Sequence, residues 1–234
     1  IGGSLLYLGD RFGDKTIYDV DFEYIEGRTP NDNSVGLKEL DHLTHNVKRG
    51  QMDVWSGFYE RIANFREIRY FDIEGKLTGL LSRAMTAPCG KIRIPINESA
   101  DDKSQIEEFI REYQGEGIQH IALSSEDIYA TVRQLRANGV QFMVTPGTYY
   151  DKVDTRVAGH GEPTDVLREL SILIDGAPGD DGILLQIFTN TVIGPIFFEI
   201  IQRKGNQGFG EGNFKALFES IEEDQIKRGV ISAD

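Results

Sequence analysis

The sequence contains the same order of expected elements twice, and this internal repeat limits the fold more than any other feature. LDHLTHNV at 40–47 alternates as a strand does, and QMDVWSGFYERIANF at 51–65 places its apolar residues on one helical stripe. Three strand-like runs separated by turn residues follow: REIRYFDI, KLTGLLSRAMT and GKIRIPIN. A first βαβββ module is therefore expected at about 40–97.

The second copy is expected at about 117–202. DKSQIEEFIREY at 102–113 is typical of a connecting helix, GIQHIALSS of a strand, and EDIYATVRQLRANGV of a helix that ends at glycine. A long insertion from about 146 to 168 interrupts the later strands, which are QFMVTP, LSILIDG, GILLQIFT and PIFFEIIQR. Two such modules predict an α+β fold whose sheets form a half-open barrel, with the first strand of each module facing its interior.

The N-terminal stretch is expected to lie outside this repeat. SLLYLGDRF and IYDVDFEYIEG both have the alternation of strands, and GRTPNDNSVG collects the glycine, proline and asparagine of a connection. We therefore expect the tail of an upstream domain at 1–29 and a linker at 30–38. The main domain would occupy 39–234 and close with an amphipathic helix at about 213–227.

The charge of the chain limits its partners. Thirty-eight acidic residues against 25 basic ones give a formal charge of −13, which repels phosphate backbones and anionic bilayers. We expect neither a nucleic-acid nor a membrane partner, and no run is apolar for the length that a membrane span needs. The single cysteine, Cys89, cannot form an internal disulfide, which favours a reducing, cytoplasmic location.

Four histidines raise the question of a metal site, and strand alternation separates two of them. His42 shares a strand face with Leu40 and Thr44, whereas His45 takes the opposite face with Asp41. The two histidines therefore cannot both point into one site. As an isolated pattern, His-x-x-His is more often a pair of hydrogen-bonded or surface histidines.

Two residues of the second module strengthen the case for a metal. Glu199 lies in the apolar run PIFFEIIQR, where an unpaired carboxylate would cost several kcal/mol, so it needs either a metal ion or a base such as Arg203. His120 stands in an equally apolar strand. Two imidazoles and one carboxylate that face one cavity form the triad that binds non-haem Fe(II). His160, in the glycine-flanked AGHGEP, is expected to be solvated.

These motifs carry a family resemblance over the whole chain. In order and spacing, LDHLTHNV, GIQHIAL, LLQIFT, PIFFEIIQR and GFGEGNFKALFESIEEDQ resemble the C-terminal half of the 4-hydroxyphenylpyruvate dioxygenases, a family of the vicinal-oxygen-chelate superfamily. The resemblance implies that His42, His120 and Glu199 bind Fe(II) and that His45 does not. It also implies a further paired-module domain upstream in full-length relatives.

The activity that this resemblance implies is a dioxygenase reaction in tyrosine and phenylalanine catabolism. 4-Hydroxyphenylpyruvate and O2 would be converted to homogentisate and CO2 by oxidative decarboxylation, ring hydroxylation and side-chain migration. The 2-oxo acid would chelate the iron and leave a position for O2. The resemblance further implies a homo-oligomer, either a dimer or a tetramer.

The resemblance also assigns residues to the substrate. It implies catalytic polar partners at Ser82, Asn97, Gln119 and Gln186. It implies substrate-binding positions at Pro95, Phe188, Phe197, Phe209, Gly210 and Phe214. By alternation Gln186 and Phe188 share a face, as do Phe197 and Glu199, although ordinary core packing explains the phenylalanines equally well. Gln119 should face away from its neighbour His120, so either the strand is distorted there or the role of Gln119 is indirect.

Alternatives remain open for the terminal helix and for the reaction. The glycines around Phe209 form a flexible lead-in, and the helix after it would be a lid that excludes water or simply a helix packed on the barrel. The rival activities are 4-hydroxymandelate synthase, an extradiol dioxygenase and a non-catalytic metal-binding relative. Pro95, Asn97 and Phe197 favour the dioxygenase over the synthase, and GFGEGNF disfavours an extradiol enzyme.

Overall fold

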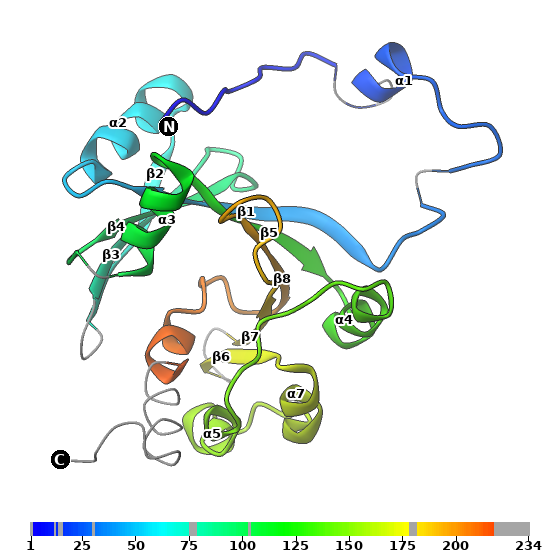
Figure 1. Cartoon of the computed structure of the whole chain (residues 1–234), viewed down its shortest axis with the longest axis vertical. Coiled ribbons are helices and arrows are strands. Elements are labelled where there is room, and N and C mark those ends of the chain that lie inside the picture. The colour runs from blue at the N-terminus through cyan, green and yellow to red at the C-terminus, as the bar shows by residue number, and fades with distance from the viewer. Residues whose placement is uncertain are drawn as a thin grey trace.

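Both helices and strands occur along the chain in this computed structural model, which describes residues 2–11, 13, 16–29, 31–74, 79–102, 104–177 and 182–217 (Figure 1). The helices are α1 (Ile17–Asp21), α2 (Met52–Ala63), α3 (Gln105–Tyr113), α4 (Ile128–Ala137), α5 (Gly147–Tyr150), α6 (Val153–Arg156) and α7 (Thr164–Leu170), followed by a terminal helix at 211–217. The strands are β1 (Leu37–Val47), β2 (Arg66–Glu74), β3 (Gly79–Thr86), β4 (Arg93–Ser99), β5 (Gly117–Ser125), β6 (Leu173–Ala177), β7 (Gly182–Phe188) and β8 (Phe197–Lys204).

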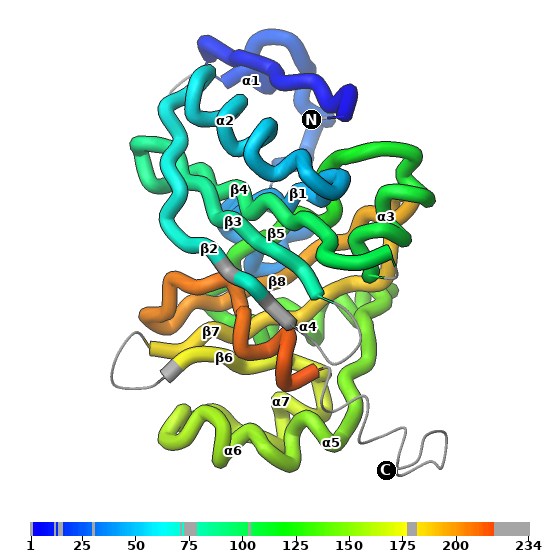
Figure 2. The backbone as a smooth tube through the Cα atoms, turned by 90° about the vertical axis from the view of Figure 1, so that its left-hand side faces the viewer, coloured from blue at the N-terminus to red at the C-terminus, as the bar shows by residue number. Residues whose placement is uncertain are grey.

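All eight of these strands form one curled sheet in the order β2-β3-β4-β1-β5-β8-β7-β6 (Figure 2). The first strands of the two modules, β1 and β5, pair antiparallel at its centre. Each of these two strands also pairs in parallel with the last strand of its own module. β1 pairs with β4, and β5 pairs with β8. The predicted α+β fold, with two βαβββ modules in a half-open barrel, is confirmed.

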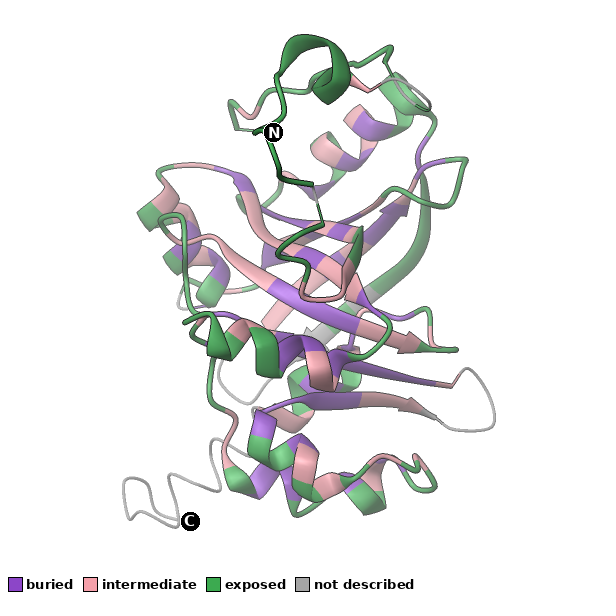
Figure 3. Cartoon of the chain, turned by 90° about the vertical axis from the view of Figure 1, so that its right-hand side faces the viewer, coloured by how far each residue is buried: buried purple, intermediate pink, exposed green. Residues whose placement is uncertain are grey.

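Each half of the sheet has its own hydrophobic core. In the first half, Val47 of β1, Met85 of β3 and Ile96 of β4 are fully buried and pack with residues of α2. In the second half, α4 and the helices of the insertion cover the strands, and a larger apolar cluster lies between them. Buried residues therefore run along the strands and the inward faces of the helices (Figure 3). Because Val47 and His45 share a face of β1, the other face, with His42 and Thr44, remains available for a site.

The N-terminal strands are a wrong expectation. Residues 17–21 form the short helix α1, none of whose side chains is buried, and the described residues from 2 to 11 have no regular structure. A strand needs a partner for its backbone groups, and neither run has a neighbouring strand in the part of the chain that the structure describes. The boundaries at 29 and 38 stay a prediction, although β1 already begins at Leu37.

One strand expected in the second module is absent, and another begins later than expected. QFMVTP at 141–146 is not a strand, since only Phe142 forms a bridge, to Thr189. The insertion is helical, because α5, α6 and α7 occupy most of it, and α7 takes the start of LSILIDG so that β6 begins only at 173. The terminal helix begins at 211, two residues earlier than expected, and the rest of the range 213–227 lies outside the described residues.

The described helices are short. α2, with 12 residues, is the longest of the labelled ones, and none of the helices in the described ranges has both the length and the apolar character of a membrane span.

Candidate metal centre

Three neighbouring strands bring the predicted metal ligands into one row. On β1, His42 lies opposite Ala122 of β5, and on the other side Ala122 lies opposite Glu199 of β8. His120 is two residues before Ala122 and therefore points to the same face. Ala122 is fully buried and its small side chain leaves room between the ligands.

The ligand atoms converge as the sequence predicts. Nε2 of His42 and Nε2 of His120 each lie 3.3 Å from Oε2 of Glu199. One ligand atom from each residue lies within 4.8 Å of the others, and the Glu199 side chain is 2% exposed. Two imidazole nitrogens and a carboxylate oxygen, desolvated and facing one point, fit a divalent transition metal such as Fe(II).

The charges of the three ligands depend on one another. Burial alone would raise the pKa of Glu199, but the two histidines beside it lower this pKa to about 2. Burial opposes protonation of His42, yet Glu199 and Asp41 raise the pKa of His42 above its ordinary value. For His120, burial prevails and the pKa is lowered. The carboxylate of Glu199 is therefore ionised, and His42 is the ligand whose pKa it raises.

A β-bulge precedes each histidine ligand. Between β1 and β5, the register passes from Leu40 opposite Leu123 to His42 opposite Ala122, so Asp41 is an extra residue. Leu40 is therefore on the face opposite to His42 and is 52% exposed, contrary to the expectation from simple alternation.

The second bulge resolves the question about Gln119. Thr44 lies opposite His120 and His45 lies opposite Ile118, so Gln119 is the extra residue on β5. The strand is distorted there, and the amide of Gln119 reaches its own neighbour, with Oε1 3.0 Å from Nδ1 of His120. Gln119 therefore contacts a ligand and does not line the pocket.

Both histidines are oriented in the same way by the residue before them. Oδ1 of Asp41 lies 2.8 Å from Nδ1 of His42, as the Gln119 amide lies against His120. A carboxylate and an amide oxygen only accept, so Nδ1 of each ring donates and Nε2 faces Glu199. Partners of this kind fix the ring and the tautomer of a metal-binding histidine.

Arg203 does not pair with Glu199, which removes the alternative of a salt bridge between these two residues. Its Nε and Nη2 donate to the two carboxylate oxygens of Asp41 at 2.8 Å each. Glu199 instead accepts a hydrogen bond from Nε2 of Gln186 at 3.1 Å through Oε1, which leaves Oε2 for the histidines.

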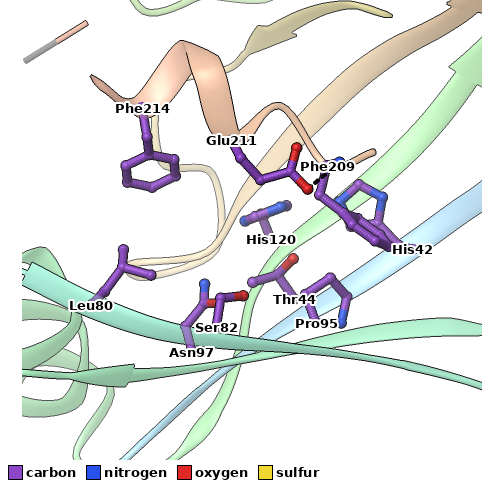
Figure 4. A pocket seen from close by; sticks show the side chains of 10 residues that line it. All are labelled: His42, Thr44, Leu80, Ser82, Pro95, Asn97, His120, Phe209, Glu211 and Phe214. Carbon is purple, nitrogen blue, oxygen red and sulfur yellow. Dashed lines mark hydrogen bonds between the residues drawn. The ribbon is translucent and has the colours of Figure 1, made fainter. Parts of the chain in front are cut away.

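A pocket opens beside the two histidines. Figure 4 shows side chains of β1, β3 and β4 on one side and Phe209, Glu211 and Phe214 of the terminal segment on the other. Its lining consists of His42, Thr44, Leu80, Ser82, Pro95, Asn97, His120, Phe209, Glu211 and Phe214. The lining thus includes Ser82, Asn97, Pro95, Phe209 and Phe214, which the family resemblance assigned to the substrate. Thr44 could have been assigned because it shares a face with His42, whereas Leu80 and Glu211 carried no signal.

Proline shapes this opening. Pro95 lies opposite Ala84 of β3, but the ladder between β4 and β1 begins only at the next residue, Ile96, opposite His45. Proline has no N–H to donate, so it is tolerated where a ladder has not yet begun. The two strands thus part at the level of Thr44, where the pocket lies.

The other expected substrate residues are outside the pocket lining, and Phe188, Phe197 and Gln186 instead contact ligands. The rings of Phe197 and Phe188 lie 5.0 and 6.1 Å from the His120 ring, measured between centroids. Gln186 is 3% exposed, and Gly210, at φ +80°, lies so close to its amide that a Cβ atom at residue 210 would overlap it. In this structure these residues support the ligands.

The remaining histidines are outside the site. His45 is buried beside Tyr59, 3.4 Å from its hydroxyl, and burial lowers the His45 pKa to about 3. His160 was expected to be solvated, which is wrong: its side chain is 6% exposed. It lies 2.9 Å from Asp154 and accepts a hydrogen bond from the Glu162 amide, so it orders its own loop.

Comparisons with known proteins agree with this geometry. A model of the Glyoxalase/Bleomycin resistance protein/Dioxygenase superfamily matches residues 39–157. The chain is 87% identical over 231 residues to a 4-hydroxyphenylpyruvate dioxygenase of Pseudomonas aeruginosa, covering 99% of this chain and 65% of the relative. It is 75% identical over 234 residues to a protein of Vibrio vulnificus named hemolysin VllY, covering 99% and 66%.

A solved structure is also similar. It is a triple mutant of 4-hydroxymandelate synthase from Streptomyces coelicolor, with a TM-score of 0.69 and 34% identity over 80% of this chain and 54% of that chain. The chain spans about two thirds of the length of the two curated relatives. On these matches, the chain belongs to the Glyoxalase/Bleomycin resistance protein/Dioxygenase superfamily, within the family of the 4-hydroxyphenylpyruvate dioxygenases.

Proposed function

We propose that this chain carries the catalytic centre of an Fe(II)-dependent dioxygenase that converts 4-hydroxyphenylpyruvate and O2 to homogentisate and CO2. The observation that carries the proposal is the convergence of His42, His120 and Glu199 beside a pocket that both polar and apolar side chains line. Three protein ligands leave coordination positions open, as oxygen-activating non-haem iron sites require. When bound there, Fe(II) would supply the electrons and the coordination positions that the 2-oxo acid and O2 need.

The pocket lining includes groups for both the polar and the apolar parts of such a substrate. Ser82 of β3 and Asn97 of β4 lie opposite each other in the ladder and present a hydroxyl and an amide to the pocket. Pro95 and Phe209 provide apolar surface close to His42. A phenol ring with a hydroxyl at one end and a 2-oxo acid at the other matches this arrangement. We propose that Ser82 and Asn97 orient the ring while its acid end faces the ligands.

The terminal segment lines one side of the pocket (Figure 4). Phe209 and Phe214 line the pocket from this segment, and Phe209 meets the His42 ring edge-on, at 5.2 Å between centroids. Phe214 is still 37% exposed. We propose that the helix beginning at 211 acts as a lid, whose task is to exclude water while the substrate is oxidised.

A second candidate reaction is the formation of 4-hydroxymandelate, which the similar synthase structure favours. A third candidate is a binder without turnover, which would keep the three ligands and the pocket but make no product. The experiment is anaerobic addition of Fe(II) and 4-hydroxyphenylpyruvate to the full-length protein, followed by air and chromatography of the products.

Homogentisate supports the proposal. Hydroxymandelate identifies the synthase reaction, and a visible charge-transfer band without product identifies a binder. Glu199→Gln should abolish both band and product, whereas His160→Gln is the matched control, because His160 lies outside the site. The cytoplasmic location and the homo-oligomeric state, dimer or tetramer, stay predictions that fractionation and light scattering of the full-length protein would test.

A further inference from the structure

Asp41 and Arg203 form a buried ion pair next to the metal ligands. Nε and Nη2 of Arg203 each donate to one carboxylate oxygen of Asp41 at 2.8 Å. The side chain of Arg203 is 12% exposed and that of Asp41 is 7% exposed. A bidentate pair of this kind is among the stronger and more directional charge-assisted contacts in proteins. Burial costs both charges their hydration, so the pair needs further contacts to be maintained.

The carboxylate of Asp41 makes one of these contacts with a metal ligand. The bulge brings Asp41 to the side of His42, where its Oδ1 accepts from Nδ1. The same oxygen accepts from Arg203, so the guanidinium fixes the carboxylate that fixes the ring. Arg93 adds a second positive charge, 3.6 Å from Oδ2.

The guanidinium of Arg203 makes the remaining contacts with the segment that leads to the terminal helix. Its Nη1 donates to the backbone oxygens of Asn206 and Gly208 at 3.1 and 2.7 Å. Its central carbon also lies 5.8 Å from the centre of the Phe209 ring, which in turn meets the His42 ring. One side chain therefore reaches both the support of a metal ligand and the aromatic cover of the same ligand.

The second histidine ligand has a different support. Gln119 occupies the corresponding position before His120, but an amide carries no charge and needs no counter-ion. Orienting an imidazole therefore does not by itself require an acid and a base. The additional feature on the His42 side is the connection, through Arg203, to residues 206–209.

We propose that Asp41 and Arg203 are a positioning pair, which holds His42 in the orientation that binds the metal and seats residues 206–209 over it. The proposal deepens the proposed function and rests on its metal site, but not on the reaction. Neither residue touches the substrate pocket space; each acts through His42 or Phe209.

The test measures metal binding by the full-length apoprotein without substrate, with Co(II) as the probe. Asp41→Asn keeps the size and one acceptor but removes the charge, and Arg203→Lys keeps the charge but removes the bidentate geometry. Each variant should weaken Co(II) binding roughly 10- to 100-fold, shift the ligand-field absorption of the bound Co(II), and speed hydrogen exchange at 206–209. Arg49→Lys is the matched control, because Arg49 pairs with Asp102 at 2.7 Å on the surface.

The double variant distinguishes a connected pair from two independent supports. A pair that acts as a unit predicts that Asp41→Asn combined with Arg203→Lys binds Co(II) no more weakly than the weaker single variant. Losses that multiply in the double variant overturn the proposal. So does Co(II) affinity within twofold of wild type in both single variants, even where thermal unfolding shows lower stability. If Asp41→Asn does not fold, Arg203→Lys alone decides by the same affinity criterion. A wild-type protein that binds Co(II) but makes no homogentisate with iron refutes the reaction and leaves the pair in place.

Discussion

Replacing Asn213 by aspartate is expected to loosen the terminal helix and the metal centre together, because one buried side chain connects them. Nδ2 of Asn213 donates to Oε1 of Gln186 at 2.8 Å, and Gln186 donates to the ligand Glu199 at 3.1 Å. On its other side, Oδ1 of Asn213 accepts from the Tyr149 hydroxyl at 2.6 Å and from Arg156 at 3.3 Å. The chain of hydrogen bonds thus runs from the insertion through the terminal helix to the metal site.

The cost follows from the donors and acceptors available. Asn213→Asp keeps the acceptor for Tyr149 but places a second acceptor against Oε1 of Gln186. If the Gln186 amide turns to donate to the new carboxylate, its oxygen faces Glu199 instead, so one buried hydrogen bond is lost in either case. A buried polar group left unsatisfied costs about 1–3 kcal/mol, which is a factor of about 5 to 150 in an equilibrium constant.

Two measurements follow this change, and both use the apoprotein. Hydrogen exchange across 205–217 should accelerate, and Co(II) affinity should fall roughly 10-fold in Asn213→Asp, because Glu199 loses its orienting donor. Asn213→Ala should release the helix as strongly but weaken Co(II) binding less, since it places no acceptor against Gln186. Lys215→Ala, on the exposed side of the same helix, is the control. Unchanged Co(II) affinity in Asn213→Asp would refute the coupling.

Four further predictions concern single residues. Gly210→Ala should lower Co(II) affinity and the protection of the terminal helix from hydrogen exchange, because φ at residue 210 is +80° and the new Cβ meets the Gln186 amide. Unchanged hydrogen-exchange rates in this helix would contradict the prediction. Ala122→Val should destabilise the protein by about 1–3 kcal/mol in urea unfolding and weaken Co(II) binding, because a buried larger side chain must fit between the ligands. His45 stays neutral in the folded protein, where its pKa is about 3, whereas in the unfolded chain it takes up a proton below about pH 6.5. The free energy of unfolding should therefore fall as the pH drops from 6.5 towards 3, by at most about 1.4 kcal/mol per pH unit. His45→Gln should flatten this slope in urea titrations. Co(II) at about 100 times its dissociation constant should raise the free energy of unfolding by about 2.7 kcal/mol in the wild type and leave Glu199→Gln unchanged in calorimetry.

The repeat predicted the half-barrel, because it depends on regular periodicity. Alternation separated His42 from His45, and the apolar surroundings of Glu199 and His120 favoured a metal site. The family resemblance then implied His42, His120 and Glu199 as the ligands. Strand pairing could not be read in the same way. Residues 17–27 and 141–146 alternate or are apolar, but within the described residues they find no neighbouring strand to form a ladder with.

The supports of the ligands could not be predicted because they depend on irregularities. A bulge changes the face of Leu40 and brings Asp41 beside His42, and no local pattern marks where the extra residue falls. The contact between Asp41 and Arg203 spans 162 positions along the chain. Asn213 carried no signal at all, since its role depends on partners in the insertion and on β7.

The central seam between β1 and β5 has a consequence for how the protein comes apart. His42 belongs to one half of the sheet, and His120 and Glu199 belong to the other, so an ion bound to all three is a cross-link between the halves. It closes two long chain loops, from 42 to 120 and from 120 to 199, whose entropy is restored only when the ion is released. With the ion bound, neither half of the sheet can unfold without the other. The two halves then unfold in a single event, although their hydrophobic cores are separate.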